Sequence, residues 1–384
     1  MINKIFAFFE NTQIMKYIMF FIYIIINLLF IVKYGIRQDI IPIYLLIILF
    51  CVSQILLFKS YDFLFKKIKI TKYFVCILTF LCVCFYVFLS HIMKDPYQLK
   101  IDRWQTIEYS LDYWIHGKYI YDTRNFMGNV PSYLPGQLVF LVGFYLLGNV
   151  GYIQVASLLL FSCTVIWAFK NNHIKFYGIF LLAISLSFLY EAVCKSDFIS
   201  SFIVASVFML FWHKKFERNY FEKSILLGFI LGIICLTRSV VVIPLILFLL
   251  KPFWETDRKQ KIKFITAFSL TVGILLASVL LPAENFDYIL KHNPLKMQGQ
   301  SNMFVVLFFL VVSVCFSFYV KNIKQVFYLS TIIVFCLMCD HIIEQVIKGY
   351  DSNFLNITYV AAALPFSIIS YCFLLNDNAY DSND

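Results

Sequence analysis

The residue best placed to do chemistry is Asp102, which opens the polar stretch that follows the third apolar segment of the chain. A carboxylate at that boundary would meet both water and the membrane face, and a general base needs such a position. Asp102 followed by Gln105 also has the spacing of a helix N-cap with a capping box. The two roles stay open and are compatible, because a capping carboxylate keeps a second oxygen free.

Two further charged positions stand next to apolar runs. Asp197 follows Lys195 and Ser196 at the start of such a run, where the pattern favours an N-terminal cap stabilised by the helix dipole. Arg238 is the only charged residue between the basic ends of residues 224–250. An arginine in a membrane segment is a functional hypothesis by default. Its side chain can snorkel to the interface or hold a lipid-linked phosphate in a bidentate grip, and we favour the second role.

An amphipathic helix is expected to carry Asp102 and its neighbours. Four apolar side chains recur at helical spacing within residues 101–117, and three polar ones share the opposite face: Trp104, Ile107, Leu111 and Trp114 against Gln105, Glu108 and Asp112. Gly117 is positioned to end this helix. The pattern predicts a helix lying on the membrane surface within an extracytoplasmic loop at residues 92–135.

The composition determines the class of protein that holds these residues. Hydrophobic residues make up 61% of the chain and charged residues only 14%, and residues 40–58, 73–93 and 264–283 carry no formal charge. About 20 helical residues span a bilayer core. Continuous apolar runs also exclude a transmembrane β-barrel. We therefore predict an all-α polytopic membrane protein in which residues 1–384 form one transmembrane domain with about 12 transmembrane helices.

The basic residues set the expected orientation. They gather at residues 59–72, 213–223, 251–263 and 321–324, which the positive-inside rule makes cytoplasmic. The formal charge of +10 is therefore better explained by anchoring than by nucleic-acid binding. Both termini are expected in the cytoplasm, with residues 376–384 as a disordered tail. The first apolar run, residues 17–32, lacks a small-residue cleavage site and is interpreted as a retained helix.

Two shorter segments break the pattern of full crossings. Residues 224–250 begin and end at basic loops, which predicts a hairpin of two short helices with its turn at residues 236–239. Residues 136–147 reach only about 18 Å as a helix, against a hydrocarbon core of about 30 Å. We interpret this second segment as a short re-entrant helix.

Neither cysteine nor histidine spacing indicates a metal site. Most of the eleven cysteines lie inside apolar runs, where they behave as small hydrophobic residues. His116 and His292 have no second ligand at metal-binding spacing and are expected to be solvated loop residues. No cofactor is indicated, and a divalent metal is possible but doubtful because Arg103, rather than a second acidic residue, follows Asp102.

Three stretches resemble the GT-C superfamily of membrane glycosyltransferases, which take a sugar from a polyprenyl-phosphate carrier. The first is Asp102 followed by residues 114–121 (WIHGKYIY), similar to the acidic residue and the Gly-x-x-x-Tyr segment of that superfamily. The second is residues 132–136 (SYLPG), similar to its entry into a short helix. The third is residues 228–239 (GFILGIICLTRS), similar to its glycine-spaced helix that ends in a basic residue. Ser239 stands where a proline commonly follows, and two extra helices precede the first loop.

The resemblance implies residue roles. Asp102 would activate the acceptor, Asp197 would be a second acidic site residue, and Arg238 would face the donor phosphate. Arg103, Glu108, Tyr133 and Lys195, from the same outer segments, complete the expected substrate-binding set.

The implied function is transfer of a sugar from a polyprenyl-phosphate donor to a lipid-, glycan- or protein-linked acceptor. The reaction would take place on the extracytoplasmic face of a bacterial inner (plasma) membrane, among membrane lipids and without nucleic acid. An O-antigen-type polysaccharide polymerase is the nearest alternative, but its largest loop is expected in the second half of the chain. A lipid or glycan transporter or flippase is the alternative from another class, and it predicts internal repeats and interrupted helices.

Overall fold

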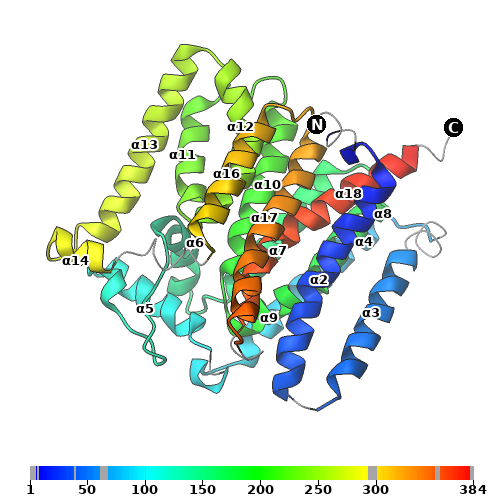
Figure 1. Ribbon diagram of the computed structural model, residues 1–384, viewed down its shortest axis with the longest axis horizontal. Helices are drawn as coiled ribbons and strands as arrows, with labels where there is room; N and C mark the ends of the chain where they lie inside the picture. Colours follow the sequence, from blue (N-terminus) through cyan, green and yellow to red (C-terminus); the bar gives the residue numbers. More distant parts are fainter. Residues whose placement is uncertain are drawn as a thin grey trace.

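The computed structural model describes residues 6, 8–38, 40–60, 68–99, 101–292, 301–350 and 355–380. Within these ranges every regular element is a helix, with sixteen α-helices and four short 3-10 helices. The helices pack side by side into one bundle (Figure 1). The all-α class predicted from the sequence is confirmed.

Seven helical segments of the described chain are long and apolar enough to cross a membrane, and a bent pair makes up to eight. The seven are α2 (Thr12–Gln38), α3 (Ile43–Ser60), α4 (Lys72–Ile92), α10 (Phe198–Phe216), α13 (Arg258–Leu280), α17 (Ile323–Ile347), and η5 (Ile357–Ala363) continued by α18 (Leu364–Tyr380). The bent pair is α8 (Asn172–Ala183) and α9 (Leu186–Cys194), which meet at 52°. A multi-pass membrane protein is therefore supported, but the prediction of about 12 crossings is wrong.

The excess in that prediction comes from short apolar helices that were counted as crossings, although residues 136–147 were predicted to be re-entrant and do not add to it. Four apolar helices have 10 to 17 residues: α6 (Pro135–Leu146), α7 (Tyr152–Ala168), α11 (Ser224–Cys235) and α16 (Met303–Ser317). A helix of 12 residues reaches about 18 Å, so its apolar composition alone does not make it a span. The remaining described elements are η2 (Pro96–Leu99), α5 (Arg103–Ile115), η3 (Ile120–Asp122), η4 (Ser239–Val241), α12 (Val242–Glu255) and α14 (Phe286–Lys291).

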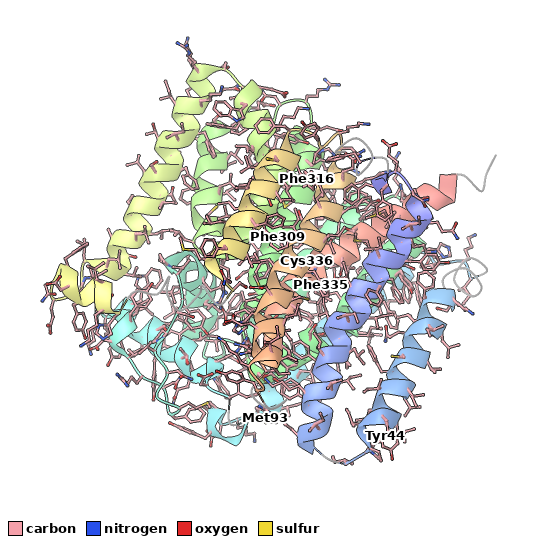
Figure 2. All side chains as sticks on the ribbon, viewed as in Figure 1. Tyr44, Met93, Phe309, Phe316, Phe335 and Cys336 are labelled. Carbon is pink, nitrogen blue, oxygen red and sulfur yellow. The ribbon has the colours of Figure 1, made fainter. Side chains whose placement is uncertain are left out.

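Large apolar side chains cover the outside of the bundle. Tyr44 on α3 is 69% exposed, Phe80 on α4 66% and Ile274 on α13 68%. Figure 2 shows side chains projecting from α16 and α17, where the labelled Phe309, Phe316 and Phe335 are only partly exposed. Exposed apolar area on this scale would be unfavourable in water and is expected where lipid is the solvent.

Helix α4 ends at Ile92 and α6 begins at Pro135, so the segment between them coincides with the loop predicted at residues 92–135, whose extracytoplasmic location stays a prediction. The helix predicted inside it is α5. Trp104, Ile107 and Leu111 are buried as the pattern predicts, and Gly117 follows the helix with φ +64°. Gln105, assigned to the polar outer face, is also buried and is held by neighbouring side chains.

The hairpin predicted over residues 224–250 is confirmed. Helix α11 ends at Cys235, and η4 begins at Ser239, so Arg238 lies in the turn. The glycine spacing of α11 serves its contact with α13, because a Cβ at Gly228 would lie 2.6 Å from the carbonyl oxygen of Phe264. This close helix contact fixes one side of the turn that carries Arg238.

The C-terminal segment differs from the predicted tail. Helix α18 continues to Tyr380, where a disordered tail was expected from residue 376. Residues 381–384 lie outside the described part of the chain.

Candidate functional site

One polar cavity of about 530 Å³ brings together five of the seven predicted site residues. Its wall includes Asp102, Arg103, Tyr133, Asp197 and Arg238. These side chains come from the start of α5, the segment before α6, the start of α10 and the α11–α12 turn. Asp102, Asp197 and Arg238 therefore line one cavity, and their chemical roles remain a proposal.

Asp102 is held by two asparagines. Its Oδ2 accepts hydrogen bonds from Asn125 Nδ2 at 2.9 Å and Asn129 Nδ2 at 2.7 Å. Asp102 occupies the N-cap position of α5, but its side chain caps no described backbone N–H, and Gln105 instead bonds Tyr97 and Phe126. The capping-box interpretation is wrong. Its carboxylate is oriented by the loop, and Oδ1 accepts no hydrogen bond from the described residues.

Asp197 and Arg238 form a buried ion pair. Arg238 Nη2 donates to Asp197 Oδ2 at 3.0 Å, and the side chain of Asp197 is 1% exposed. Asp197 also occupies an N-cap position without capping its helix, α10. Burial acts to lower the pKa of Arg238, but Asp197 and two nearby tyrosines raise it, and the net shift is upward. Arg238 therefore remains a cation inside the protein.

Aromatic rings enclose the guanidinium of Arg238. Its Cζ lies 5.2 Å from the ring centre of Tyr133 and 5.4 Å from that of Phe198, both within cation–π range. Burial and the Asp197 carboxylate raise the pKa of Tyr133 well above its usual value, so its hydroxyl stays neutral at physiological pH. Arg238 Nε and Asp197 Oδ1 are buried and have no hydrogen-bond partner among the described residues. One hydrogen-bond donor, Arg238 Nε, and one acceptor, Asp197 Oδ1, are thus left beside the ion pair.

Arg103 is anchored by a carboxylate that sequence reasoning missed. Arg103 Nη1 donates to Ser196 Oγ at 3.0 Å and lies 3.8 Å from Glu191 Oε1. Glu191 is fully buried on α9 and also accepts from Gln154 Nε2 at 3.1 Å and Ile199 N at 2.8 Å. The signal was available, because an acidic residue inside an apolar run is a functional candidate, but residues 191–197 were interpreted as an outer loop.

Glu108 and Lys195 do not join the cavity wall formed by the described residues. Glu108 Oε1 accepts from Trp104 Nε1 at 2.7 Å, and Lys195 Nζ lies 3.5 Å from the centre of the Trp104 ring. Burial lowers the pKa of Lys195, while Glu108 partly opposes this shift. Lys195 connects α5 to the turn between α9 and α10, and Glu108 holds Trp104 from within α5.

The cavity wall also includes residues from both ends of the chain. Lys33, Tyr34 and Arg37 come from the end of α2, and Thr358 and Tyr359 come from η5. Sequence reasoning used Lys33 only as the polar flank of the first apolar run. Its spacing of four residues from Arg37 places both on one helix face, which is the signal that could have identified them.

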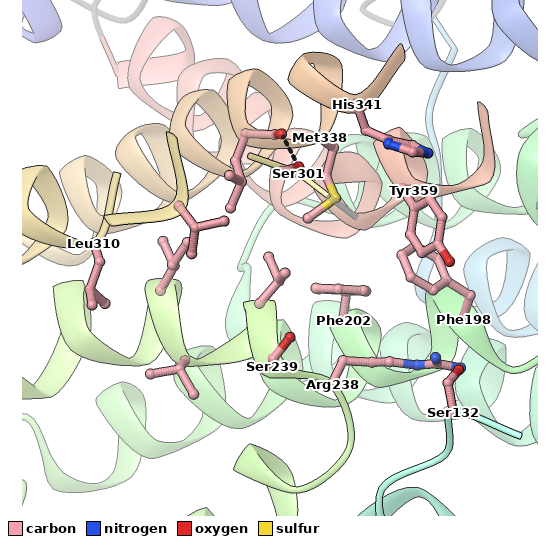
Figure 3. Close-up of a pocket in the computed structure, with 15 residues that line it drawn as sticks. Ser132, Phe198, Phe202, Arg238, Ser239, Ser301, Leu310, Met338, His341 and Tyr359 are labelled. Atoms are coloured by element: carbon pink, nitrogen blue, oxygen red, sulfur yellow. Dashed lines mark hydrogen bonds between the residues drawn. The ribbon is translucent and has the colours of Figure 1, made fainter. Parts of the chain in front are cut away.

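An apolar pocket of about 290 Å³ adjoins the polar cavity. The two share Ser132, Phe198, Arg238 and Tyr359. Figure 3 shows Arg238 along one wall of this pocket, with Met338, His341 and Tyr359 on the opposite wall. Apolar side chains line most of the rest, together with Ser239 and Ser301: Phe202, Val240, Val242, Ile243, Val306, Leu310 and Leu337. Arg238 therefore lies where a charged chamber meets an apolar one.

The described residues contain no group of three or more His, Cys, Asp or Glu side chains arranged to hold a metal ion. Comparison with known proteins adds no assignment. No protein-family model, no curated protein and no solved structure matches the chain. The functional argument therefore depends on the two pockets and the groups that line them.

Proposed function

We propose that the protein is a membrane glycosyltransferase that moves a sugar from a polyprenyl-phosphate donor to an acceptor hydroxyl. The observation that carries the proposal is the position of Arg238 at the border of the polar cavity and the apolar pocket. A lipid-linked sugar has the same division, with a sugar at one side of its phosphate and a hydrocarbon chain at the other. Guanidinium groups bind phosphate oxygens in a bidentate manner.

The proposed reaction is a direct displacement at the anomeric carbon. The acceptor oxygen forms the new bond to that carbon while its proton passes to Asp102, whose free Oδ1 is the expected base. The bond from the anomeric carbon to the phosphate oxygen breaks, and the electron pair leaves with the lipid phosphate. Arg238 stabilises the negative charge that develops there, and Asp197 holds Arg238 in place.

We further propose that the cavity opens on the extracytoplasmic side of a bacterial inner membrane, with both termini in the cytoplasm. The starts of α13 and α17 lie at the upper end of the bundle, whereas α5, α9 and α14 lie towards the lower end (Figure 1). The upper ends carry the basic loops, and Lys321 there pairs with Glu10 at 3.2 Å. Basic residues mark the cytoplasmic side of membrane proteins.

Sugar transfer by the purified protein tests the proposal directly. Wild type is incubated in detergent with a panel of radiolabelled polyprenyl-phosphate sugars and compared with Asp102→Asn and Arg238→Ala. We expect each substitution to lower transfer about 100-fold or more, the usual effect of losing a general base or a charge-stabilising donor. Asp112→Asn on α5 and Arg218→Ala in an exposed loop are the matched controls and should retain activity, since neither residue lines the cavity. Full transfer by Asp102→Asn would exclude the proposed base.

A non-enzymatic transporter or flippase is the second candidate, and one observation favours it. The 52° break between α8 and α9 interrupts a span, and the polar side chains of Asn27, Ser185 and Ser187 bond one another there. Interrupted helices with polar groups at depth are typical of transporters. Movement of a labelled lipid-linked sugar across proteoliposomes, without transfer to any acceptor, would support this candidate over the enzyme.

A further inference from the structure

Basic side chains outnumber acidic ones along the wall of the polar cavity. Four basic side chains and two acidic ones from the described residues line it: Lys33, Arg37, Arg103 and Arg238 against Asp102 and Asp197. Asp197 faces Arg238, and Glu191, behind the wall, faces Arg103. An excess of cations in a buried chamber favours an anionic ligand there.

Two of these cations come from the end of α2, in the N-terminal part of the chain whose two extra helices the GT-C resemblance does not explain. Lys33 and Arg37 flank Tyr34, with distances to its ring centre of 5.9 Å from Lys33 Nζ and 5.6 Å from Arg37 Cζ. Tyr34 in turn stacks on Tyr190 of α9 at 4.5 Å between ring centres. We call Lys33, Tyr34 and Arg37 the α2 wall. It is fixed to the rest of the site through an aromatic pair that also lines the cavity.

Helix energetics alone do not account for the α2 wall. The helix dipole favours cations in the last turn, but like charges four residues apart repel each other by a few tenths of a kcal/mol. The ammonium group of Lys33 donates to the backbone carbonyl of Leu355, which is neutral. Arg103 lies between the two ends of the cavity, close enough to interact electrostatically with both Lys33 and Arg238. Lys33 and Arg238 have otherwise separate contacts, because Lys33 bonds Leu355 whereas Arg238 pairs with Asp197.

We propose that the α2 wall is a second anion-binding site, which takes a phosphate ester carried by the acceptor. Calling this ligand the acceptor rests on the proposed glycosyltransferase function, whereas the anion site itself does not. The acceptor hydroxyl would approach Asp102 while its phosphate rests on Lys33 and Arg37. The donor phosphate would remain at Arg238, on the border with the apolar pocket.

Equilibrium binding of radiolabelled farnesyl phosphate to the full-length protein in detergent tests the site. We expect two molecules per wild-type chain. Arg238→Ala should retain one of them, and the double variant Lys33→Gln/Arg37→Gln should retain the other. Lys94→Gln, an exposed lysine outside the cavity wall, should still bind two. A single molecule per wild-type chain, or two that survive Lys33→Gln/Arg37→Gln, would overturn the proposal.

Competition by inorganic phosphate shows whether the α2 wall binds free phosphate or only a phosphate carried by a lipid. Displacement of the molecule that depends on Lys33 and Arg37 would show that the site takes the phosphate alone. Retention of that molecule would show that a lipid-borne phosphate is required. Both results support an anion site at the α2 wall. If the double variant fails gel filtration, the single variant Lys33→Gln is used instead, and a tenfold weaker second binding step is expected.

The transfer assay then separates this inference from the proposed function. Lys33→Gln/Arg37→Gln should raise KM for a phosphorylated acceptor about tenfold or more, the effect of losing one charge-assisted hydrogen bond, with KM for the donor unchanged. Binding of two phosphates without sugar transfer would contradict the proposed function but would support the second anion site. Sugar transfer by a protein that binds only one phosphate would contradict the second anion site and leave the proposed function supported.

Discussion

At the scale of the residue, sequence reasoning selected five residues that the fold places around one cavity, and the capping role considered for two of them is absent. Asp102 and Asp197 both precede helices, where a short carboxylate normally caps the backbone. In the fold neither does so, because Asp102 is bonded by Asn125 and Asn129, and Asp197 is paired with Arg238. Those partners are 23 to 41 residues away in the chain. No spacing rule based on adjacent turns could have found them.

The Asp197–Arg238 pair leads to a stability prediction. Asp197→Ala or Arg238→Ala alone should destabilise the protein by about 3–5 kcal/mol, because each leaves one buried charge without its partner. The double variant Asp197→Ala/Arg238→Ala should be more stable than either single variant, because no unpaired charge remains. Thermal unfolding of the purified proteins in detergent gives the comparison. Strictly additive losses in the double variant would mean that the two side chains do not interact energetically.

At the scale of the element, the sequence predicted α5, α6 and the α11–α12 hairpin well, because each has caps, glycines or apolar spacing of its own. It gave no information on what the glycines contact. Gly136 opens α6 against the last turn of α11, where an added Cβ would overlap the carbonyl group of Ile233 and lie 2.8 Å from the Leu236 carbonyl oxygen. Helix α6 therefore supports the turn that carries Arg238. Only the folded chain shows this, since about 100 residues separate the two segments.

The contact at Gly136 yields a paired prediction. Gly136→Ala should destabilise the protein by about 1–3 kcal/mol through overpacking and should weaken farnesyl phosphate binding at Arg238, because the added carbon displaces the turn. Gly143→Ala lies on the same helix with nothing within 4 Å of the new carbon. It should leave binding unchanged and increase helix stability by up to about 1 kcal/mol. Equal binding by the two variants would show that α6 does not set the position of the turn.

At the scale of the whole molecule, the membrane class was predictable and the number of spans was not. Hydropathy records how apolar a segment is, without recording whether lipid or protein covers it. Within their apolar windows α3 and α13 are 11% buried, whereas α10 is 72% buried, although all three are apolar. Two short apolar helices, α12 and α16, line the apolar pocket. The predicted dozen counted such segments as crossings.

Orientation is tested at the same scale. A short epitope inserted after Arg124, in the exposed loop beside the cavity, should be accessible to antibody on intact spheroplasts of a bacterial host. The same epitope inserted after Arg218, in an exposed basic loop, should become accessible only after lysis. The opposite pattern would place the cavity on the cytoplasmic side and remove the basis for a donor presented outside.

The ion pair behind the site also sets an order of events during synthesis. Asp197 leaves the ribosome 41 residues ahead of Arg238, a delay of about 2–8 s at usual elongation rates. The delay between synthesis of Lys33 and of its partner is far longer, because the Leu355 carbonyl that it contacts lies 322 residues further along the chain. The nascent protein therefore enters the bilayer with charges whose partners do not yet exist. Until the last helix arrives, those charges must be shielded by water, lipid headgroups or the insertion machinery, so the chamber closes as one of the final steps of biogenesis.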